Sequence, residues 1–251
     1  MKNKFLKILK VIILFNFIFI NGVFGSEIKF EAEKIEINDK TIIKASNNIV
    51  IKDGQRMEIY GDKLLIDKEE KNYTISDNVT LIDKENKITI NAKKIIFNER
   101  KNLILSEGTT KIKKENQYVI NTSDILFNRL KKKISSEKKT EIKDNDKNSL
   151  NTENLVIRIK DNLIVAEKVI LTDKEFNIYE IKNLYYNYKN KELLGKDIIV
   201  NQDNKLSSKR YLPRIKSNSL NIENRISTFN KAVYTNCKKR DGCPPWLIKA
   251  E

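Results

Sequence analysis

The stretch Lys87 to Lys113, KITINAKKIIFNERKNLILSEGTTKIK, is one copy of a unit that recurs about every thirty residues. Each unit has a run of alternating apolar and polar residues, a short polar turn, a second alternating run and another turn. Aligned on one apolar position, the copies are spaced by 29, 31, 30, 30 and 29 residues. The aligned residues are Ile35, Leu64, Ile95, Ile125, Leu155 and Leu184. This fixed period predicts a stack of similar structural units.

Each alternating run is typical of a half-buried β-strand. Apolar side chains take every second position, as in Ile88, Ile90 and Ala92, and the runs are rich in Ile, Val, Thr, Tyr and Phe. Asn, Asp and Lys fill two turns per unit, for example residues 83–86 and 98–102. Two turns per unit make one hairpin. The sequence therefore predicts an all-β fold of repeated antiparallel hairpins, with roughly a dozen long strands.

The alternation slips by one residue at the same place in successive units. Ile95, not Lys94, follows Ala92 in the apolar set, and Leu64 follows Gly61 in the same way. The later pairs are Thr122 with Ile125 and Thr152 with Leu155. Such a slip turns the side chains to the other face unless the backbone bends or bulges. An aligned slip favours a common corner and an elongated V-shaped sandwich with an apolar interior. A flat meander with bulges is the alternative.

Residues 1–25 are typical of a secretory signal peptide. Four lysines and no acid accompany the apolar core VIILFNFIFI, and small residues predict cleavage between Gly25 and Ser26. The core is too short for a comfortable membrane span; a retained N-terminal anchor is the alternative. The signal predicts that the rest of the chain lies outside the cytoplasm. We expect the repeats over 26–200, and terminal strands with a junction segment over 201–251.

The composition excludes several classes of site. The chain has 251 residues and no His, which removes the commonest general base and metal ligand. Its Asp and Glu residues lie mostly in turns, so we expect no catalytic residue, no metal and no cofactor. An enzyme acting on an acidic polymer is the weakest alternative. The net charge of +15 suits phosphates or anionic lipid. The lysines are spread evenly, however, which also fits an ordinary solvated surface, and we expect no nucleic-acid partner.

The C-terminal segment holds the two cysteines of the chain, Cys237 and Cys243. In an exported protein two cysteines most often form a disulfide, here with each other or with another chain. A zinc site would need more ligands than these. The sequence ends in WLIKAE, which reads as the start of a further strand and raises the alternative that the chain is a fragment of a longer protein.

Two sets of residues resemble a known family. The segments FEAEKIEIND (30–39), IKASNNIVIKDG (43–54) and YTISDNVTLIDKENKITINAKKIIFNE (73–99) resemble the OstA-like repeats of the lipopolysaccharide transport proteins, the family of LptA, LptC and LptD. The end of the chain, with YTNC at 234–237 and PPWLIKA at 244–250, is similar to the junction that precedes the β-barrel in the outer-membrane assembly member, LptD. The resemblance covers nearly all of 27–251.

The resemblance implies a β-jelly-roll in the periplasm or at the outer membrane, whose apolar groove carries the acyl chains of lipopolysaccharide, with lipid A as ligand. It also implies partner proteins: other jelly-roll proteins of the family, joined edge to edge by strand pairing, and a β-barrel with its plug lipoprotein if the chain is a fragment. Cys237 matches the junction cysteine that pairs with the barrel in that family. The sequence departs from the pattern because no barrel strands follow Glu251. A stand-alone bridge protein like LptA is therefore the alternative.

The residues expected to line the lipid groove surround the mid-strand corner and face inward. They are Ile35, Ile37, Ile49, Ile51, Ile59, Leu64, Ile66, Val79, Leu81, Ile90, Ile95 and Phe97. Ordinary core packing is the alternative at every one of these positions, and at any single position it is the simpler explanation. A secreted structural scaffold with a sealed core is therefore the competing function, because one alternation pattern serves a dry core and a groove alike.

Overall fold

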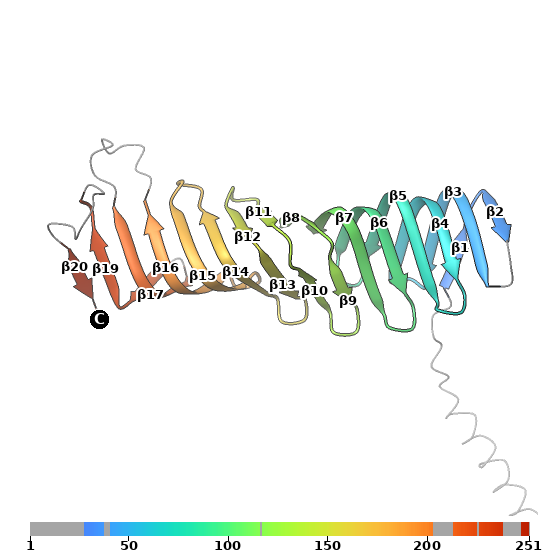
Figure 1. The fold of residues 1–251 in the computed structure, drawn as a ribbon. Coiled ribbons are helices and arrows are strands. Elements are labelled where there is room, and N and C mark those ends of the chain that lie inside the picture. The colour runs from blue at the N-terminus through green and yellow to red at the C-terminus, as the bar shows by residue number, and fades with distance from the viewer. Residues whose placement is uncertain are drawn as a thin grey trace, which may run out of the picture.

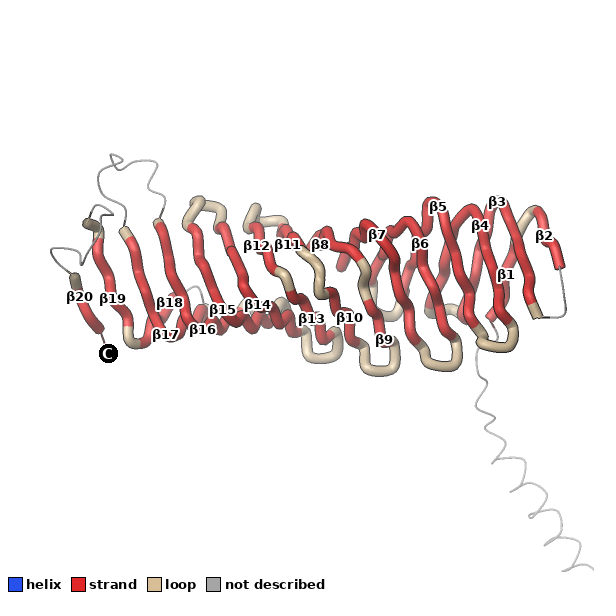
Figure 2. Tube along the Cα trace, in the orientation of Figure 1, coloured by secondary structure: helices blue, strands red, loops and turns tan. Residues whose placement is uncertain are grey.

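The structure is a computed structural model that describes residues 28–37, 41–115, 117–202, 213–224, 226–237 and 247–250. Within these residues every regular element is a β-strand, and twenty strands form one antiparallel sheet (Figure 1 and Figure 2). The strands follow one another along an elongated body. The predicted all-β fold of stacked antiparallel hairpins is confirmed.

The N-terminal region consists of long strands that run uninterrupted, after a short pair at the end of the body. Consecutive long strands are neighbours in the sheet, and both short strands pair with the first long strand. The bounds are β1 (Ile28–Glu31), β2 (Lys34–Ile37), β3 (Ile42–Asp53), β4 (Met57–Asp67), β5 (Asn72–Asp83), β6 (Ile88–Asn98) and β7 (Leu103–Lys114).

The middle and C-terminal regions continue the same hairpins. In the middle region each long run is broken in two at the corner, which is why there are more strands than the sequence predicts. Its strands are β8 (Tyr118–Ser123), β9 (Leu126–Asn128), β10 (Lys133–Ser136), β11 (Thr140–Asp144), β12 (Ser149–Thr152) and β13 (Asn154–Arg158). The C-terminal strands are β14 (Leu163–Thr172), β15 (Ile178–Asn187), β16 (Glu192–Asn201), β17 (Arg214–Glu223), β18 (Ile226–Asn230), β19 (Ala232–Thr235) and β20 (Ile248–Ala250).

The register divides the sheet into two arms that meet at a corner, and each long strand crosses from one arm to the other. Arm A consists of β1, β8, β11, β12, β19, β20 and residues 49–53, 57–61, 79–83, 88–92, 110–114, 169–172, 178–181, 198–201 and 214–217. Arm B consists of β2, β9, β10, β13, β18 and residues 42–46, 63–67, 72–76, 94–98, 103–107, 163–167, 183–187, 192–196 and 219–223.

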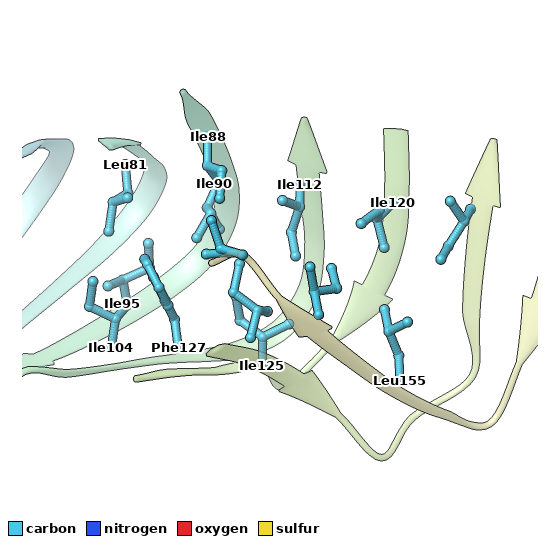
Figure 3. Packing of buried hydrophobic residues seen from close by; sticks show 14 of the residues in the cluster. Leu81, Ile88, Ile90, Ile95, Ile104, Ile112, Ile120, Ile125, Phe127 and Leu155 are labelled. Atoms are coloured by element: carbon cyan, nitrogen blue, oxygen red, sulfur yellow. The ribbon is translucent and has the colours of Figure 1, made fainter. Parts of the chain in front are cut away.

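The two arms face each other across the apolar interior. Figure 3 shows Leu81, Ile90 and Ile112 of arm A opposite Ile95 and Phe127 of arm B. Side chains on both sides of the slip are buried in the same cluster. The corner predicted from the slip is therefore confirmed, and the flat meander is excluded for the described residues.

The corner of the N-terminal region holds an extra residue in alternate strands. Asn47 and Asn48 of β3 face Asp62 alone in β4, and their φ angles are 64° and 51°. Asp77 and Asn78 of β5 repeat this arrangement, with φ angles of 65° and 53°. Asn and Asp enter this left-handed region more readily than other side chains. The additional residue lengthens the strand at the corner, and the side chains that point into the interior before the corner are followed by side chains that also point into it.

We call the edge of each arm that lies farthest from the corner its rim. Two turns at the rim of arm A are stabilised by an aspartate that accepts hydrogen bonds from the end of its own turn. The carboxylate of Asp144 accepts hydrogen bonds from the backbone N and side-chain Nδ2 of Asn148, at 2.9 and 2.7 Å. Asp173 accepts the same two bonds from Asn177, both at 2.9 Å. These Asx interactions satisfy backbone groups that the ladder leaves open. They explain why the repeat carries Asp at this position.

Candidate functional site

The candidate site is the apolar interior together with the rims of the two arms. Ten of the twelve predicted groove residues lie in one buried cluster with side chains from every region of the molecule. They are Ile49, Ile51, Ile59, Leu64, Ile66, Val79, Leu81, Ile90, Ile95 and Phe97. The interior is continuous from β3 to β17 because each hairpin adds inward side chains next to those of its neighbours.

The other two predicted groove residues lie at the end of the body. Ile35 and Ile37 of β2 are 50% and 67% exposed. They pair with Ala45 and Ile43 of β3, both of which are buried in the interior cluster. The inward-facing apolar positions of arm B thus continue onto β2. No further strand of the described residues lies beyond β2 to cover these two side chains. The apolar interior therefore meets solvent at this end.

Two ion pairs connect the rims of the arms in the N-terminal half. The Arg129 guanidinium lies 2.5 Å from the Asp53 carboxylate, and the two side chains are only 14% and 7% exposed. Arg129 also lies over the Phe97 ring, 5.4 Å from its centroid. Lys132 and Glu85 form a second bridge of 2.7 Å in a more exposed setting. Asp53 belongs to arm A and Arg129 follows β9 of arm B. These ion pairs therefore hold the rims of the two arms together.

A group of tyrosines closes the middle of the interior. The hydroxyls of Tyr118 in arm A and Tyr186 in arm B lie 3.1 Å apart, and Tyr188 packs edge-on against Tyr118. Beneath them lies an apolar cavity of about 20 Å³, lined by isoleucines with Lys114, Tyr118 and Tyr188 at its outer end. That volume holds about one water molecule, and an apolar lining keeps such a space dry.

On the solvent side, the same tyrosines border a polar basin. The basin has a volume of about 680 Å³ and is bounded by the turns that follow β7, β11, β13 and β15. Its walls carry Lys114, Lys189 and Lys191 together with Glu115 and acids of the β11–β12 turn. The tyrosine group, defined as Tyr118, Tyr186 and Tyr188, therefore separates a dry apolar interior from a wet basin lined by charges of both signs.

Burial shifts the titration of the groups at this boundary. It lowers the pKa of Lys114, against the opposing effect of Glu115 and Asp83. Burial also raises the pKa of Tyr118, helped by the hydrogen bond with Tyr186, and raises that of Tyr188. Tyr118 and Tyr188 are therefore neutral at physiological pH and act as hydrogen-bonding groups with apolar faces.

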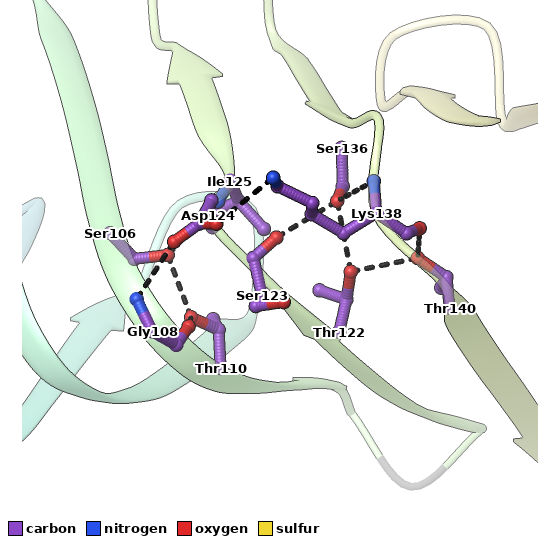
Figure 4. Close-up of polar contacts among 10 residues, drawn as sticks. All are labelled: Ser106, Gly108, Thr110, Thr122, Ser123, Asp124, Ile125, Ser136, Lys138 and Thr140. Atoms are coloured by element: carbon purple, nitrogen blue, oxygen red, sulfur yellow. Dashed lines mark hydrogen bonds and ion pairs between the residues drawn. The ribbon is translucent and has the colours of Figure 1, made fainter. Parts of the chain in front are cut away.

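Buried hydroxyl groups form a second feature of the interior, one that was not predicted from the sequence. At the middle corner Thr122 bonds Ser136 at 2.9 Å and Thr140 at 2.7 Å. Ser106 bonds Thr110 at 2.7 Å and accepts the backbone N–H of Ile125 at 3.0 Å (Figure 4). These hydroxyls replace ladder bonds where the strands break. The sequence contained this signal, since buried Ser or Thr residues lie next to the slip at Ser106, Thr110, Thr122, Ser136, Thr140 and Thr152.

Several predicted residues are untested. Gly25, Ser26 and Cys243 lie outside the described residues, so the cleavage site and the disulfide stay predictions. Cys237 is buried, and its backbone carbonyl accepts a hydrogen bond of 3.0 Å from Arg214. The part of the chain that the structure describes contains no cluster of three potential metal ligands. Nor does any of it form a helix long and apolar enough to cross a membrane.

Comparisons with known proteins complete these observations. Neither a protein-family model nor a curated protein matches the sequence. Among solved structures, one similar chain is LptH of Pseudomonas aeruginosa, described as the LptA homologous periplasmic component of the lipopolysaccharide transport device. The similarity covers 67% of this chain and 80% of that chain, with 11% sequence identity and a TM-score of 0.20. The fold assignment therefore rests on the strand register described above.

Proposed function

We propose that this chain is a periplasmic module that binds the acyl chains of lipopolysaccharide between its two arms and passes them along its length during outer-membrane assembly. The observation that carries the proposal is the continuous apolar interior that extends through all repeats and meets solvent at Ile35 and Ile37. A path with equivalent apolar contacts in every repeat lets a chain move from one repeat to the next without a catalytic group.

Binding requires the arms to separate, because the interior side chains are buried and the cavity of about 20 Å³ under the tyrosine group is far too small for an acyl chain. Each methylene transferred into the interior contributes about 0.8 kcal/mol, so one acyl chain of ordinary length contributes several kcal/mol. Opposing this, the arms must break bridges such as Asp53–Arg129 and the contact between Tyr118 and Tyr186. The exposed row at β2 offers an entrance that requires the least separation.

The basin above the tyrosine group suits the polar part of such a lipid. Lys114, Lys189 and Lys191 can pair with phosphates there, while the tyrosine hydroxyls bond sugar oxygens. Acyl chains would then pass between the tyrosines into the interior. This arrangement places the charged group in water and the chains in the apolar cluster, as the amphipathic ligand requires.

The exposed strands at the two ends of the sheet support a place in a chain of similar modules. Among the described residues a single neighbour pairs with each of β1 and β2 at one end, and with each of β18 and β20 at the other. Each of these strands therefore has an edge with open backbone groups. We propose that other jelly-roll proteins of the transport family pair with these edges. A role like that of the LptD N-terminal domain would add a β-barrel and its lipoprotein partner; a role like that of LptA would not.

A structural scaffold with a sealed core is the second candidate, and a specific observation favours it. Ile51, Ile59, Ile90 and Ile95 are fully buried, and the cavity of about 20 Å³ under the tyrosine group is far too small for an acyl chain. A scaffold keeps this closed state permanently, whereas a lipid carrier opens it.

Photocrosslinking in living cells distinguishes the two functions. A photoreactive residue replaces Ile90 or Phe97 in the interior, and a control places it at Thr89, whose side chain faces outward on the strand that carries Ile90. Lipopolysaccharide adducts at the interior positions alone establish the carrier. A folded protein without adducts at either interior position overturns the proposal and favours the scaffold.

A further inference from the structure

The outer surface of arm B carries an apolar row that crosses ten strands from β4 to β16. Its members are paired directly with one another in the register of the sheet. In order they are Leu65, Thr74, Ile96, Leu105, Leu126, Ser135, Val156, Val165, Tyr185 and Leu194. We call this set the outer row of arm B. It continues into Lys44 at one end and Asn221 at the other.

This row is open to solvent, since Leu65, Leu105, Leu126, Tyr185 and Leu194 are between 38% and 44% exposed. The corresponding outward row of arm A is polar from β4 to β12. There it contains Tyr60, Thr80, Asn91, Lys111, Asn121, Glu141 and Asn151. It continues through Ile170, Glu180 and Ile199, of which the two isoleucines are 48% and 39% exposed. Exposed large apolar residues are therefore more numerous in the row of arm B, which has five, than in that of arm A, which has two. An apolar strip of this length on a soluble surface indicates an interaction site.

The charges that flank the row differ in sign between its two sides. On β16, Lys196 lies toward the corner and Glu192 toward the rim, with Leu194 between them. In the middle the signs are reversed, because Lys133 and Arg158 lie toward the rim and Glu167 lies toward the corner. The outward alternation of each strand places all of these side chains on the surface that holds the row.

We propose that a second copy of this chain packs on the outer row of arm B, with a two-fold axis parallel to the row. Rotation about that axis places the corner side of one copy over the rim side of the other, strand by strand. Lys196 then meets Glu192 of the second copy, and Glu167 meets the neighbouring Arg158. The opposite signs on the two sides of the row are what this symmetry requires for attraction.

The other face-to-face arrangement has its two-fold axis across the row, and the charges oppose it. It reverses the order of strands and places β16 over β4. Lys196 then faces Lys63, and Glu192 faces Asp67.

The size of the surface fits a weak dimer. Nine strand-to-strand steps of about 4.8 Å give a row about 43 Å long, and three outward positions per strand give a width of about 14 Å. The strip is therefore about 600 Å² per copy, somewhat below the roughly 800 Å² per partner of standard stable interfaces. We expect a dissociation constant in the micromolar range, because interfaces below the standard size are typical of weak or transient complexes. The inference does not depend on lipid binding.

Sedimentation velocity of the chain as cells export it tests the proposal. We expect reversible dimerisation over a concentration series centred on about 10 µM. Leu126→Arg places a charge at the centre of the row and should weaken dimerisation at least about tenfold. Ile170→Arg is the matched control, since Ile170 is a 48% exposed apolar strand residue on the outside of arm A. A dimer unaffected by Leu126→Arg, or a strictly monomeric parent chain, overturns the proposal.

Charge reversals then test the symmetry. Lys196→Glu and Glu192→Lys should each weaken the dimer severalfold, and the double variant should restore it, because each residue meets the other across a parallel axis. With the axis across the row, Lys196→Glu would instead strengthen the dimer. If the row serves a membrane, the chain stays monomeric and Leu126→Arg releases it from phosphatidylethanolamine–phosphatidylglycerol vesicles, which also overturns the proposal.

Discussion

The N-terminal and C-terminal regions turn the same corner with different numbers of residues. In β3 and β5 two left-handed residues face one residue of the next strand. In the C-terminal region a single residue of β14, Lys168, faces a single residue of β15, Lys182, which in turn faces Asp197 of β16. Lys168 and Asp197 have φ angles of 51° and 53°. One residue with a left-handed backbone conformation is therefore enough to turn the corner. The second such residue in β3 and β5 has another effect.

The extra residue changes how the strands coil. A bulge bends its strand and increases the local twist, and Figure 1 shows the N-terminal strands coiling around the interior while those of the C-terminal region lie more openly. The contacts between the rims differ between the two regions in the same way. The N-terminal rims join through the nearly buried Asp53–Arg129 pair, whereas Lys191 and Asp146, 3.5 Å apart, are 72% and 66% exposed.

The largest expected effect comes from breaking the two rim pairs in turn. Arg129→Ala leaves the buried Asp53 carboxylate without its guanidinium and should reduce the free energy of unfolding by about 3–5 kcal/mol. Lys191→Ala removes an exposed pair and should cost about 0.5 kcal/mol or less. Urea unfolding monitored by circular dichroism measures both. Equal effects would mean that the N-terminal rims are no more tightly joined than the C-terminal ones.

A smaller effect is expected from a methyl group added beside the corner. A Cβ on Gly61 would lie 2.5 Å from the Ile75 methyl carbon Cγ2, whereas a Cβ on Gly195 would lie 3.1 Å from Ile181 Cγ2. Gly61→Ala should therefore destabilise the fold by about 2 kcal/mol, and Gly195→Ala by about 1 kcal/mol or less. Thermal unfolding of the two variants gives the comparison. A reversed order would show that the N-terminal corner accommodates volume more easily.

The smallest effect concerns tyrosines at the two rims. Burial, with Glu99 nearby, raises the pKa of Tyr73 to about 12, and burial with Asp173 raises that of Tyr179 to about 12. Both values exceed the ordinary 10.0, so each neutral phenol stabilises the fold fully below pH 10, and this contribution is lost as the pH rises towards 12. Tyrosinate absorbance at 295 nm should show one late-titrating group fewer in Tyr73→Phe and in Tyr179→Phe. A loss confined to one variant would show that the two rims differ in burial.

The architecture of the fold could be predicted from the sequence, but the contacts between the two arms could not. The slip after Ala92 predicted a corner, because side-chain alternation is a local property that one strand reveals by itself. Asn47 and Asn48 were visible as well, yet the extra residue becomes a bulge only against the single Asp62 of the next strand. The groove residues were identified as inward-facing, but the exposure of Ile35 and Ile37 depends on their place at the end of the sheet.

The repeat alone determined the strands, the turns and the apolar interior, since each follows from residue types at fixed spacing along the chain. Only the tertiary structure decided which rim residues meet. Asp53 and Arg129 are 76 positions apart in the sequence. They come together because the twist of the arms displaces the turns of one arm by several strands relative to the other arm. The outer row of arm B has the same origin. Its members lie in separate repeats and become one surface only when strand register aligns them.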